Sequence, residues 1–228
     1  MTEQAGGMPE LIITILGFRA QNAGEEVTLS IQLSSGVHTE LRTLVLDVAT
    51  YAARKPQKGR ISEAELEQLE NDARIHEAVK CGERLLAYGS NTKLQLARKL
   101  VGRGFTREEA EAGVAKLSAL GLIDEAADLR REVERCLRKD WGEGRIRQQL
   151  FARGFDRAAM AQLVDVLAEV DFVPPCKRFI QKRYGGLPDD REEERRMLAG
   201  LYRYGYRMED IRQAMRELRA EAEQEGKR

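Results

Sequence analysis

Few side chains in the sequence are suited to catalysis. There are two histidines, His38 and His76, and three cysteines, Cys81, Cys136 and Cys176. Their spacing matches no metal-binding pattern, and the sequence has no G-x-x-x-x-G-K-[ST] loop to hold nucleotide phosphates. The carboxylates lie on charged helical faces rather than as isolated pairs in apolar segments. We therefore expect no enzyme, no metal site and no cofactor, and we expect reduced cysteines in a cytoplasmic protein.

Binding chemistry is better represented, because basic side chains are concentrated in one part of the chain. The whole sequence is neutral, with 38 basic and 38 acidic residues. Residues 130–188, however, hold 13 basic and 8 acidic side chains. Such an excess can orient a protein on a polyanion or on an acidic protein surface, and a solvated helix surface is the alternative interpretation. The candidate binding residues are Arg98, Lys99, Arg103, Arg145, Arg147, Arg153, Lys177, Arg178, Lys182, Arg183, Arg203, Tyr204 and Arg207.

Some of these candidates also have a structural explanation. Arg103 and Arg153 each precede a glycine at a predicted helix end, where a cation stabilises the helix dipole. The segment YRYGYR places Tyr204 between arginines, a composition suited to base stacking and phosphate contact. We expect Arg145, Arg147 and Arg153 to lie off the core, so that reversing their charges leaves the fold intact.

An internal repeat indicates which elements would position these residues. VGRGF at 101–105 returns as FARGF and then as YRYGY, with glycines 50 and then 51 residues apart. The same offset aligns Val114 with Val164, which predicts that both are buried. The residues that define the repeat are Leu100, Gly104, Phe105, Leu150, Gly154, Phe155, Leu201, Gly205 and Tyr206.

Each repeated glycine is predicted to end a helix. Glycine readily adopts the left-handed backbone conformation that closes many helices, and the next residue then folds back onto the last turn. Gly104 would in this way bring Phe105 against Leu100, and the other two copies would do the same. Capping boxes at Ser62 and Thr106 mark helix starts. The pattern predicts three short helices in each unit of about 50 residues.

The N-terminal segment follows a different pattern. VTLSIQL at 27–33 alternates apolar and polar residues, and segments 11–16 and 37–46 are rich in β-branched residues. This predicts a three-stranded antiparallel sheet, followed by a linker at 54–59. Because the sheet shares no repeat unit with the remainder, we expect the helical part to fold without it.

The expected fold class is α+β and mainly α. A small N-terminal three-stranded antiparallel sheet precedes three tandem three-helix repeats of about 50 residues in an elongated, curved array. No apolar run is long enough to cross a membrane. The expected ranges are 1–54 for the β-domain, 55–77 for a linker and capped helix, 78–129 for repeat 1, 130–179 for repeat 2, and 180–228 for repeat 3 and a C-terminal tail.

Three segments carry a resemblance to a known family. AKLSALGLIDEAADL, RKDWGEGRIRQQLFARGF and LAGLYRYGYRMEDIRQAM are similar to the RecX family of recombination regulators. The shared elements are the Leu-Gly-aliphatic-Asp turn at 120–124, a glycine before the middle helix of repeat 2 (Gly142 or Gly144), and the recurrent glycine–aromatic stop. The family often has paired aspartates and a phenylalanine after that turn. This chain has Asp124-Glu125-Ala126-Ala127-Asp128, so roles tied to those residues do not carry over.

The resemblance implies a non-enzymatic regulator of homologous recombination and DNA repair. RecX-like proteins bind the RecA recombinase filament on DNA, lodge in its helical groove, and limit filament growth, ATP hydrolysis and strand exchange. The implied partners are the RecA filament and, more weakly, single- or double-stranded DNA, with a monomeric chain and no membrane. The resemblance supplies no catalytic set, so the candidate binding residues rest on charge and spacing alone.

A second class of function is open on the residues alone. Two helices joined by a tight glycine turn resemble a helix-turn-helix, so the chain could be a DNA-binding module that acts without a recombinase. The two functions differ in one measurable quantity. That quantity is the affinity for DNA alone compared with the affinity for a RecA–DNA filament at the same salt concentration.

Overall fold

The computed structural model describes residues 10–225, which form two compact units. The first unit comprises residues 10–89 and 97–122, and the second comprises residues 90–96 and 123–225. Within the described residues, no helix is long and apolar enough to cross a membrane. The first nine residues of the expected β-domain and the last three of the expected C-terminal tail lie outside the described part.

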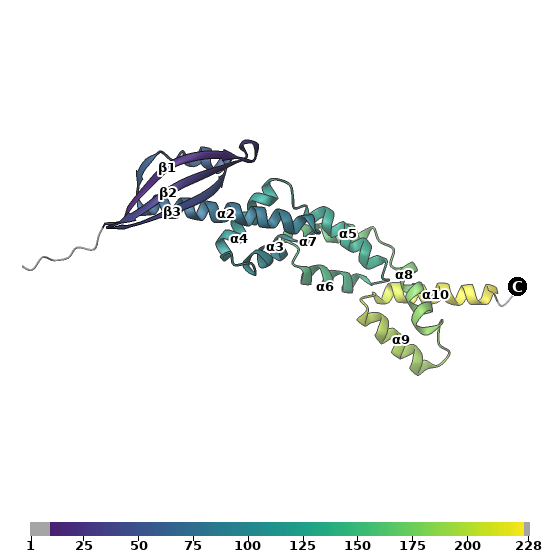
Figure 1. The fold of residues 1–228 in the computed structure, drawn as a ribbon. Coiled ribbons are helices and arrows are strands. Elements are labelled where there is room, and N and C mark those ends of the chain that lie inside the picture. Colours follow the sequence, from purple (N-terminus) through teal and green to yellow (C-terminus); the bar gives the residue numbers. More distant parts are fainter. Residues whose placement is uncertain (1–9, 226–228) are drawn as a thin grey trace, which may run out of the picture. The chain divides into compact units, whose positions relative to one another are not determined.

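The first unit contains a four-stranded antiparallel sheet (Figure 1). Strands β1 (Ile12–Gln21), β2 (Glu26–Ser35) and β3 (His38–Asp47) match the three predicted segments, with a 3₁₀ turn (Asn22–Gly24) between the first two. The predicted count of three strands is wrong, because β4 (Gly59–Ile61) pairs with β1 on the side away from β2. A strand of three residues is too short to show period-two alternation, so the sequence pattern did not reveal it.

One face of the sheet packs on helix α2 (Glu63–Ala87), as Figure 1 shows. The alternation predicted for β2 is confirmed, since the four apolar residues of VTLSIQL are all buried. They share a core with Leu66, Leu69 and Ala73, which recur at helical spacing along α2. The predicted capping box at Ser62 is also confirmed at the start of this helix. The sheet and the first long helix therefore have a common core.

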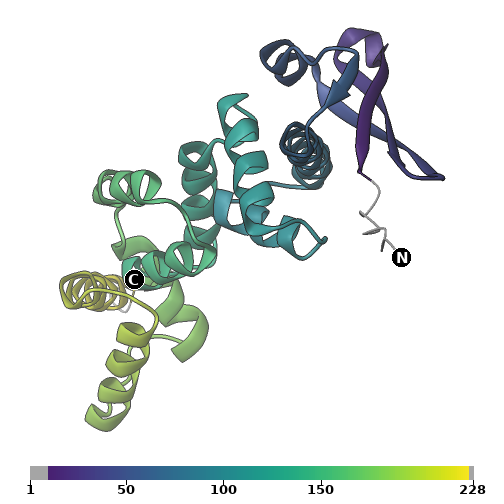
Figure 2. The same cartoon turned by 90° about the vertical axis from the view of Figure 1, so that its left-hand side faces the viewer.

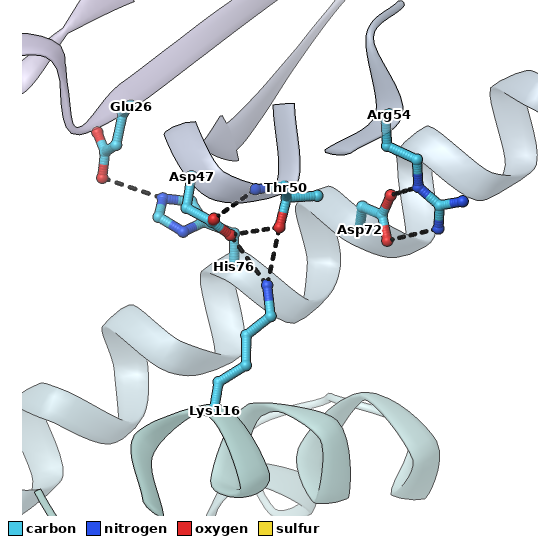
Figure 3. A network of polar contacts seen from close by, with 7 residues as sticks. All are labelled: Glu26, Asp47, Thr50, Arg54, Asp72, His76 and Lys116. Carbon is cyan, nitrogen blue, oxygen red and sulfur yellow. Dashed lines mark hydrogen bonds and ion pairs between the residues drawn. The ribbon is translucent and has the colours of Figure 1, made fainter. Parts of the chain in front are cut away.

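Polar contacts add to this core within the first unit (Figure 3). Asp47 caps helix α1 (Val48–Arg54) by accepting a hydrogen bond of 2.8 Å from the amide of Thr50. Its second carboxylate oxygen lies 2.9 Å from the ammonium of Lys116 on helix α4 (Arg107–Ala119). Burial would raise the pKa of Asp47, but Thr50 and Lys116 outweigh burial and lower the pKa to about 2. The expected domain boundary at residue 54 falls inside this unit, at the end of α1.

Deletion of residues 1–57 should destabilise the remaining chain, although the repeat pattern alone suggested that the helices would fold without the sheet. The deletion would expose Leu66 and Leu69, and full burial of a leucine side chain contributes about 1.5–3 kcal/mol. It would also remove Asp47, the partner of Lys116. We expect aggregation or a reduced helical signal, measured by size-exclusion chromatography and circular dichroism. A soluble truncated chain with undiminished helical content would contradict this account.

The second unit is built from two groups of three helices (Figure 2). The first group is α5 (Glu125–Leu137), α6 (Glu143–Arg153) and α7 (Arg157–Ala168), and the second is α8 (Val173–Tyr184), α9 (Arg191–Arg203) and α10 (Met208–Glu225). Each group has its own apolar core, one containing Leu129, Ile146 and Leu163, and the other Ile180, Met197 and Ile211. The start of α3 (Lys93–Val101) also belongs to this unit.

The glycine stops predicted from the repeat are confirmed. Gly104, Gly154 and Gly205 have positive φ angles of 92°, 72° and 90°. In the first and third copies, the residue after the glycine donates its amide to the carbonyl five residues earlier, over 3.4 and 3.2 Å. The predicted cap at Thr106 starts the helix that follows it, and Asp156 caps α7 at the equivalent position of the second copy. These local features were readable because each depends on only a few neighbouring residues.

One predicted core position is wrong. Val114 is buried in α4, but the side chain of Val164 in α7 is 53% exposed. Helix α7 buries Ala159, Leu163 and Leu167, which lie four residues apart on one face of the helix. Val164 lies beside that face. The offset of 50 residues therefore aligns the helix ends of the two repeats but not every core position of α4 and α7.

Candidate functional site

Helix α6 begins where helix α9 ends, and the two backbones touch. The amide of Gly142 donates to the carbonyl of Tyr204 over 3.1 Å, and the amide of Gly144 donates to the carbonyl of Gly205 over 2.9 Å. The first amides and the last carbonyls of a helix have no partner within the helix, so each end satisfies the other. A β-carbon on Gly142 would overlap the backbone of Gly205, which explains the glycine there. We call this contact the α6–α9 junction.

A related contact occurs one repeat earlier, between the start of α3 and the end of α6. The hydroxyl of Thr92 donates to the carbonyl of Arg153 over 3.0 Å, and the side chain of Leu94 lies against Gly154. Each of these residues precedes its counterpart in the α6–α9 junction by 50 or 51 positions. We call this contact the α3–α6 junction, and both junctions lie within the second unit.

An ion pair spans each junction, with its charges reversed between the two. In the α3–α6 junction, the ammonium of Lys93 lies 2.9 Å from the carboxylate of Asp156. At the corresponding positions of the α6–α9 junction, the carboxylate of Glu143 lies 2.5 Å from the guanidinium of Arg207. The carboxylate of Glu125 also accepts hydrogen bonds from the amides of Lys93 and Asp156, over 2.6 and 2.8 Å. The attraction across the junction is therefore kept while the residue types change.

A buried carboxylate in the turn after α5 accounts for two of the predicted binding cations. Asp140 lies 2.8 Å from the guanidinium of Arg178 and 2.6 Å from the ammonium of Lys182. Burial would raise the pKa of Asp140, but Lys182 and Arg178 outweigh burial and lower the pKa below its usual range. The hydroxyl of Tyr206 donates to the backbone carbonyl of Asp140 over 2.6 Å. These contacts join the first helix group to the second.

Two further candidates are paired with buried carboxylates. Arg147 donates to Glu143 over 2.7 Å, and Arg153 pairs with Glu132. The expectation that both arginines can be reversed without harm to the fold does not fit this arrangement. A glutamate at either position would bring a like charge against a buried carboxylate. That carboxylate would keep one basic partner instead of two, Arg207 for Glu143 and Arg135 for Glu132, so we expect a loss of stability.

Arg145 has a different environment from its neighbours. Its guanidinium lies over two aromatic rings, 4.4 Å from the ring centre of Trp141 and 4.2 Å from that of Tyr204. The ammonium of Lys139 lies 5.1 Å from the centre of the same Trp141 ring. Among the described residues, Arg145 has no acidic partner. We call Lys139, Trp141, Arg145 and Tyr204 the aromatic–arginine cluster.

The sequence identified only part of this cluster. Arg145 and Tyr204 were candidates, and the structure brings them together across the α6–α9 junction. Lys139 and Trp141 were missed. The available signal was the segment KDWGEG, in which the single tryptophan of the chain stands directly before Gly142.

The remaining candidates have varied surroundings. Lys177 is paired with carboxylates of α10. Arg183 and Arg203 are exposed and have no acidic partner within residues 10–225. The candidates that lie in the first unit, all exposed, are Arg98, Lys99 and Arg103.

The cysteines and the buried histidine are held in the core. All three cysteines are free and buried, and burial raises the pKa of Cys136 and raises that of Cys176 to about 12. Such thiols are weak nucleophiles at neutral pH. His76 is bonded to Glu26 over 3.0 Å. No cluster of three metal-ligating side chains occurs within residues 10–225.

Comparison with known proteins places the chain in a family. Residues 176–215, which span most of α8 to α10, match the family model described as the third three-helix domain of RecX. A protein named "Regulatory protein RecX" from Stenotrophomonas maltophilia strain K279a is 31% identical over 133 residues, covering 58% of this chain and 81% of that protein. The chain belongs to the RecX family of regulatory proteins. A RecX relative from Halorhodospira halophila is also 31% identical, over 132 residues and with the same coverage.

Two solved RecX structures share the fold. A crystal structure of regulatory protein RecX has a TM-score of 0.66 at 19% identity, covering 89% of this chain and 98% of that one. The crystal structure of RecX from Lactobacillus salivarius has a TM-score of 0.56 at 18% identity, covering 64% of this chain and 97% of that one. The Leu-Gly-aliphatic-Asp turn on which the RecX resemblance rested ends α4 and starts α5, with Gly121 at a φ of 72° and Asp124 capping α5.

Replacement of Gly142 by alanine should loosen the α6–α9 junction. The new β-carbon would overlap the backbone of Gly205, and overpacking of this kind costs about 1–3 kcal/mol. Gly144→Ala is the matched control, because its β-carbon would lie 3.4 Å from the nearest atoms of Gly205, a contact that a small shift can accommodate. Urea unfolding of both variants measures the difference in free energy of unfolding. Equal stabilities would show that the close approach of the two backbones does not hold the junction.

Proposed function

We propose that this chain is a non-enzymatic regulator of homologous recombination and DNA repair. It binds the RecA–DNA filament as a cytoplasmic monomer and inhibits filament growth, ATP hydrolysis and strand exchange. Membership of the RecX family supports this function, as do the α-helical groups that we propose as three tandem repeats, α2–α4, α5–α7 and α8–α10.

The single observation that carries the proposal is the position of Arg145. Its guanidinium lies over the rings of Trp141 and Tyr204, 4.4 and 4.2 Å from their centres. Because it has no acidic partner among the described residues, its N–H groups remain available as donors. A guanidinium presents these donors in a fork that fits a phosphate or a carboxylate with two parallel hydrogen bonds. The rings hold this fork in one orientation, so little conformational entropy is lost when an anion binds.

The paired cations support the same assignment by elimination. Arg147, Arg153 and Arg207 each contact a buried carboxylate, so binding an external anion would require breaking an internal pair. Arg145 has no such pair to break. Lys139, whose ammonium lies over the Trp141 ring, adds a second positive charge. We therefore assign the filament contact of the second unit to the aromatic–arginine cluster.

Arg145→Ala should weaken binding to a RecA filament assembled on single-stranded DNA. Hydrogen bonds to a charged group contribute about 1.5–3 kcal/mol, which corresponds to an affinity loss of about ten- to a hundred-fold. Inhibition of RecA-driven ATP hydrolysis should fall in parallel, because inhibition depends on occupancy. Arg157→Ala is the matched control, since Arg157 is an exposed arginine of the same unit outside the cluster. Thermal unfolding confirms that both variants are folded.

Two outcomes would contradict the proposal. If Arg145→Ala binds the filament as tightly as the parent at low salt, the aromatic–arginine cluster is not part of the interface. Equal affinity of the parent for DNA alone and for the filament, with an equal loss in both, would instead identify a DNA-binding module that acts without a recombinase.

A further inference from the structure

The first unit contains a cavity of about 690 Å³ beside the second half of α2. Arg84 and Tyr88 line it from the end of α2, and Arg103 and Phe105 line it from the turn after α3. This volume lies within the range of about 300–1,000 Å³ that is typical of ligand sites. We call it the basic cavity, because two of its arginines have no acidic partner among the described residues.

The acidic side chains of the basic cavity are already neutralised. Glu26 lies 3.0 Å from the ammonium of Lys80 and is also bonded to His76, and the Glu26–His76 bond is visible in Figure 3. The hydrogen bond from Lys80 lowers the pKa of Glu26 despite burial, so this carboxylate is ionised and paired. Glu77 is paired with Arg74 at 2.7 Å.

Two guanidiniums of the basic cavity are left without an acidic partner. Arg84 donates only to the backbone carbonyl of Lys80, over 3.3 Å, and Arg103 has no ion pair within the described residues. The lining therefore has a local excess of positive charge, although the whole chain is neutral. Two exposed arginines that line one cavity favour an anion with several oxygen atoms.

An aromatic side chain stands beside these cations. Tyr88 is 93% exposed, so its ring has free faces, and it directly follows the last residue of α2. The ring of Phe105 is less available, because the guanidinium of Arg74 lies 4.6 Å from its centre. Free aromatic faces next to arginines are the combination that binds single-stranded nucleic acid, through base stacking and phosphate contact.

A neighbouring part of the α2 surface has an excess of acidic side chains. A second cavity, of about 590 Å³, shares Glu26, His76 and Lys80 with the basic cavity. It is also lined by Glu25, Glu83 and Asp47, so its acidic side chains outnumber its basic ones, Lys80 and Lys116. A polyanion would thus be attracted to the basic cavity and repelled by the second cavity.

We propose that the basic cavity binds a nucleotide of single-stranded nucleic acid. The base stacks on Tyr88, and Arg84 and Arg103 hold the adjoining phosphates. This inference deepens the proposed function and rests on it, because it gives the first unit its own contact with the DNA strand. The contact is separate from the aromatic–arginine cluster, which lies in the second unit.

The test measures binding of a fluorescein-labelled oligothymidylate to the full chain at low and at moderate salt. Arg84→Glu, Arg103→Glu and Tyr88→Ala should each weaken binding, by about ten-fold for the lost stacking contact. The two arginine variants should also reduce the salt dependence of binding, because each removes about one phosphate contact. Arg107→Glu is the matched control, since Arg107 is 81% exposed in the same unit and outside the cavity.

The outcomes separate this inference from the proposed function. Unchanged oligothymidylate affinity in all three variants, or no binding by the parent at low salt, overturns the inference. Polyglutamate serves as a second probe. If the three variants lose binding to polyglutamate but keep the parent's affinity for oligothymidylate, the inference is also overturned, and the ligand is an acidic protein segment. The filament assay with Arg145→Ala decides the proposed function independently of these results.

Discussion

The second unit depends on the direct backbone contact between the start of one helix and the glycine-terminated end of another. The amides of Gly142 and Gly144 and the carbonyls of Tyr204 and Gly205 would all lack partners in isolated helices. Pairing them satisfies four polar groups at once, and it requires that no side chain stand between the backbones. The glycine at 205 therefore has two functions. It ends α9 in the left-handed conformation, and it leaves room for the backbone of α6.

The junctions also explain where the positive charge of the chain is used. A segment with 13 basic and 8 acidic residues suggests a cationic surface, but several of these acids are buried and draw basic partners inward. Glu132, Asp140 and Glu143 together hold arginines and a lysine from α6, α8 and the start of α10. Arg145 is held by aromatic rings instead, which fixes its position without neutralising it. Under the proposed function, the paired cations are structural residues and the stacked Arg145 is the binding residue.

Local features were predictable from the sequence, whereas features that depend on a distant partner were not. The caps at Ser62 and Thr106 and the glycine stops were correct because each involves residues within about one helical turn. Strand β4 was missed because it consists of three residues whose structure comes from pairing with β1. Arg153 was interpreted as a surface cation because Glu132, its partner, lies 21 residues earlier in the chain. Trp141 was missed for the same reason. Arg145 contacts both Trp141 and Tyr204, and Tyr204 reaches this position only when the α6–α9 junction forms.

Amide hydrogen exchange at Gly142 and Gly144 tests the central claim most directly. Both amides belong to the first turn of α6 or its cap, where exchange is ordinarily fast because the groups face water. If they donate to Tyr204 and Gly205 as described, both should exchange as slowly as the interior amides of α6. Fast exchange at both positions, with the interior of α6 and α9 protected, would show that the helices are formed but not joined, and it would contradict the account.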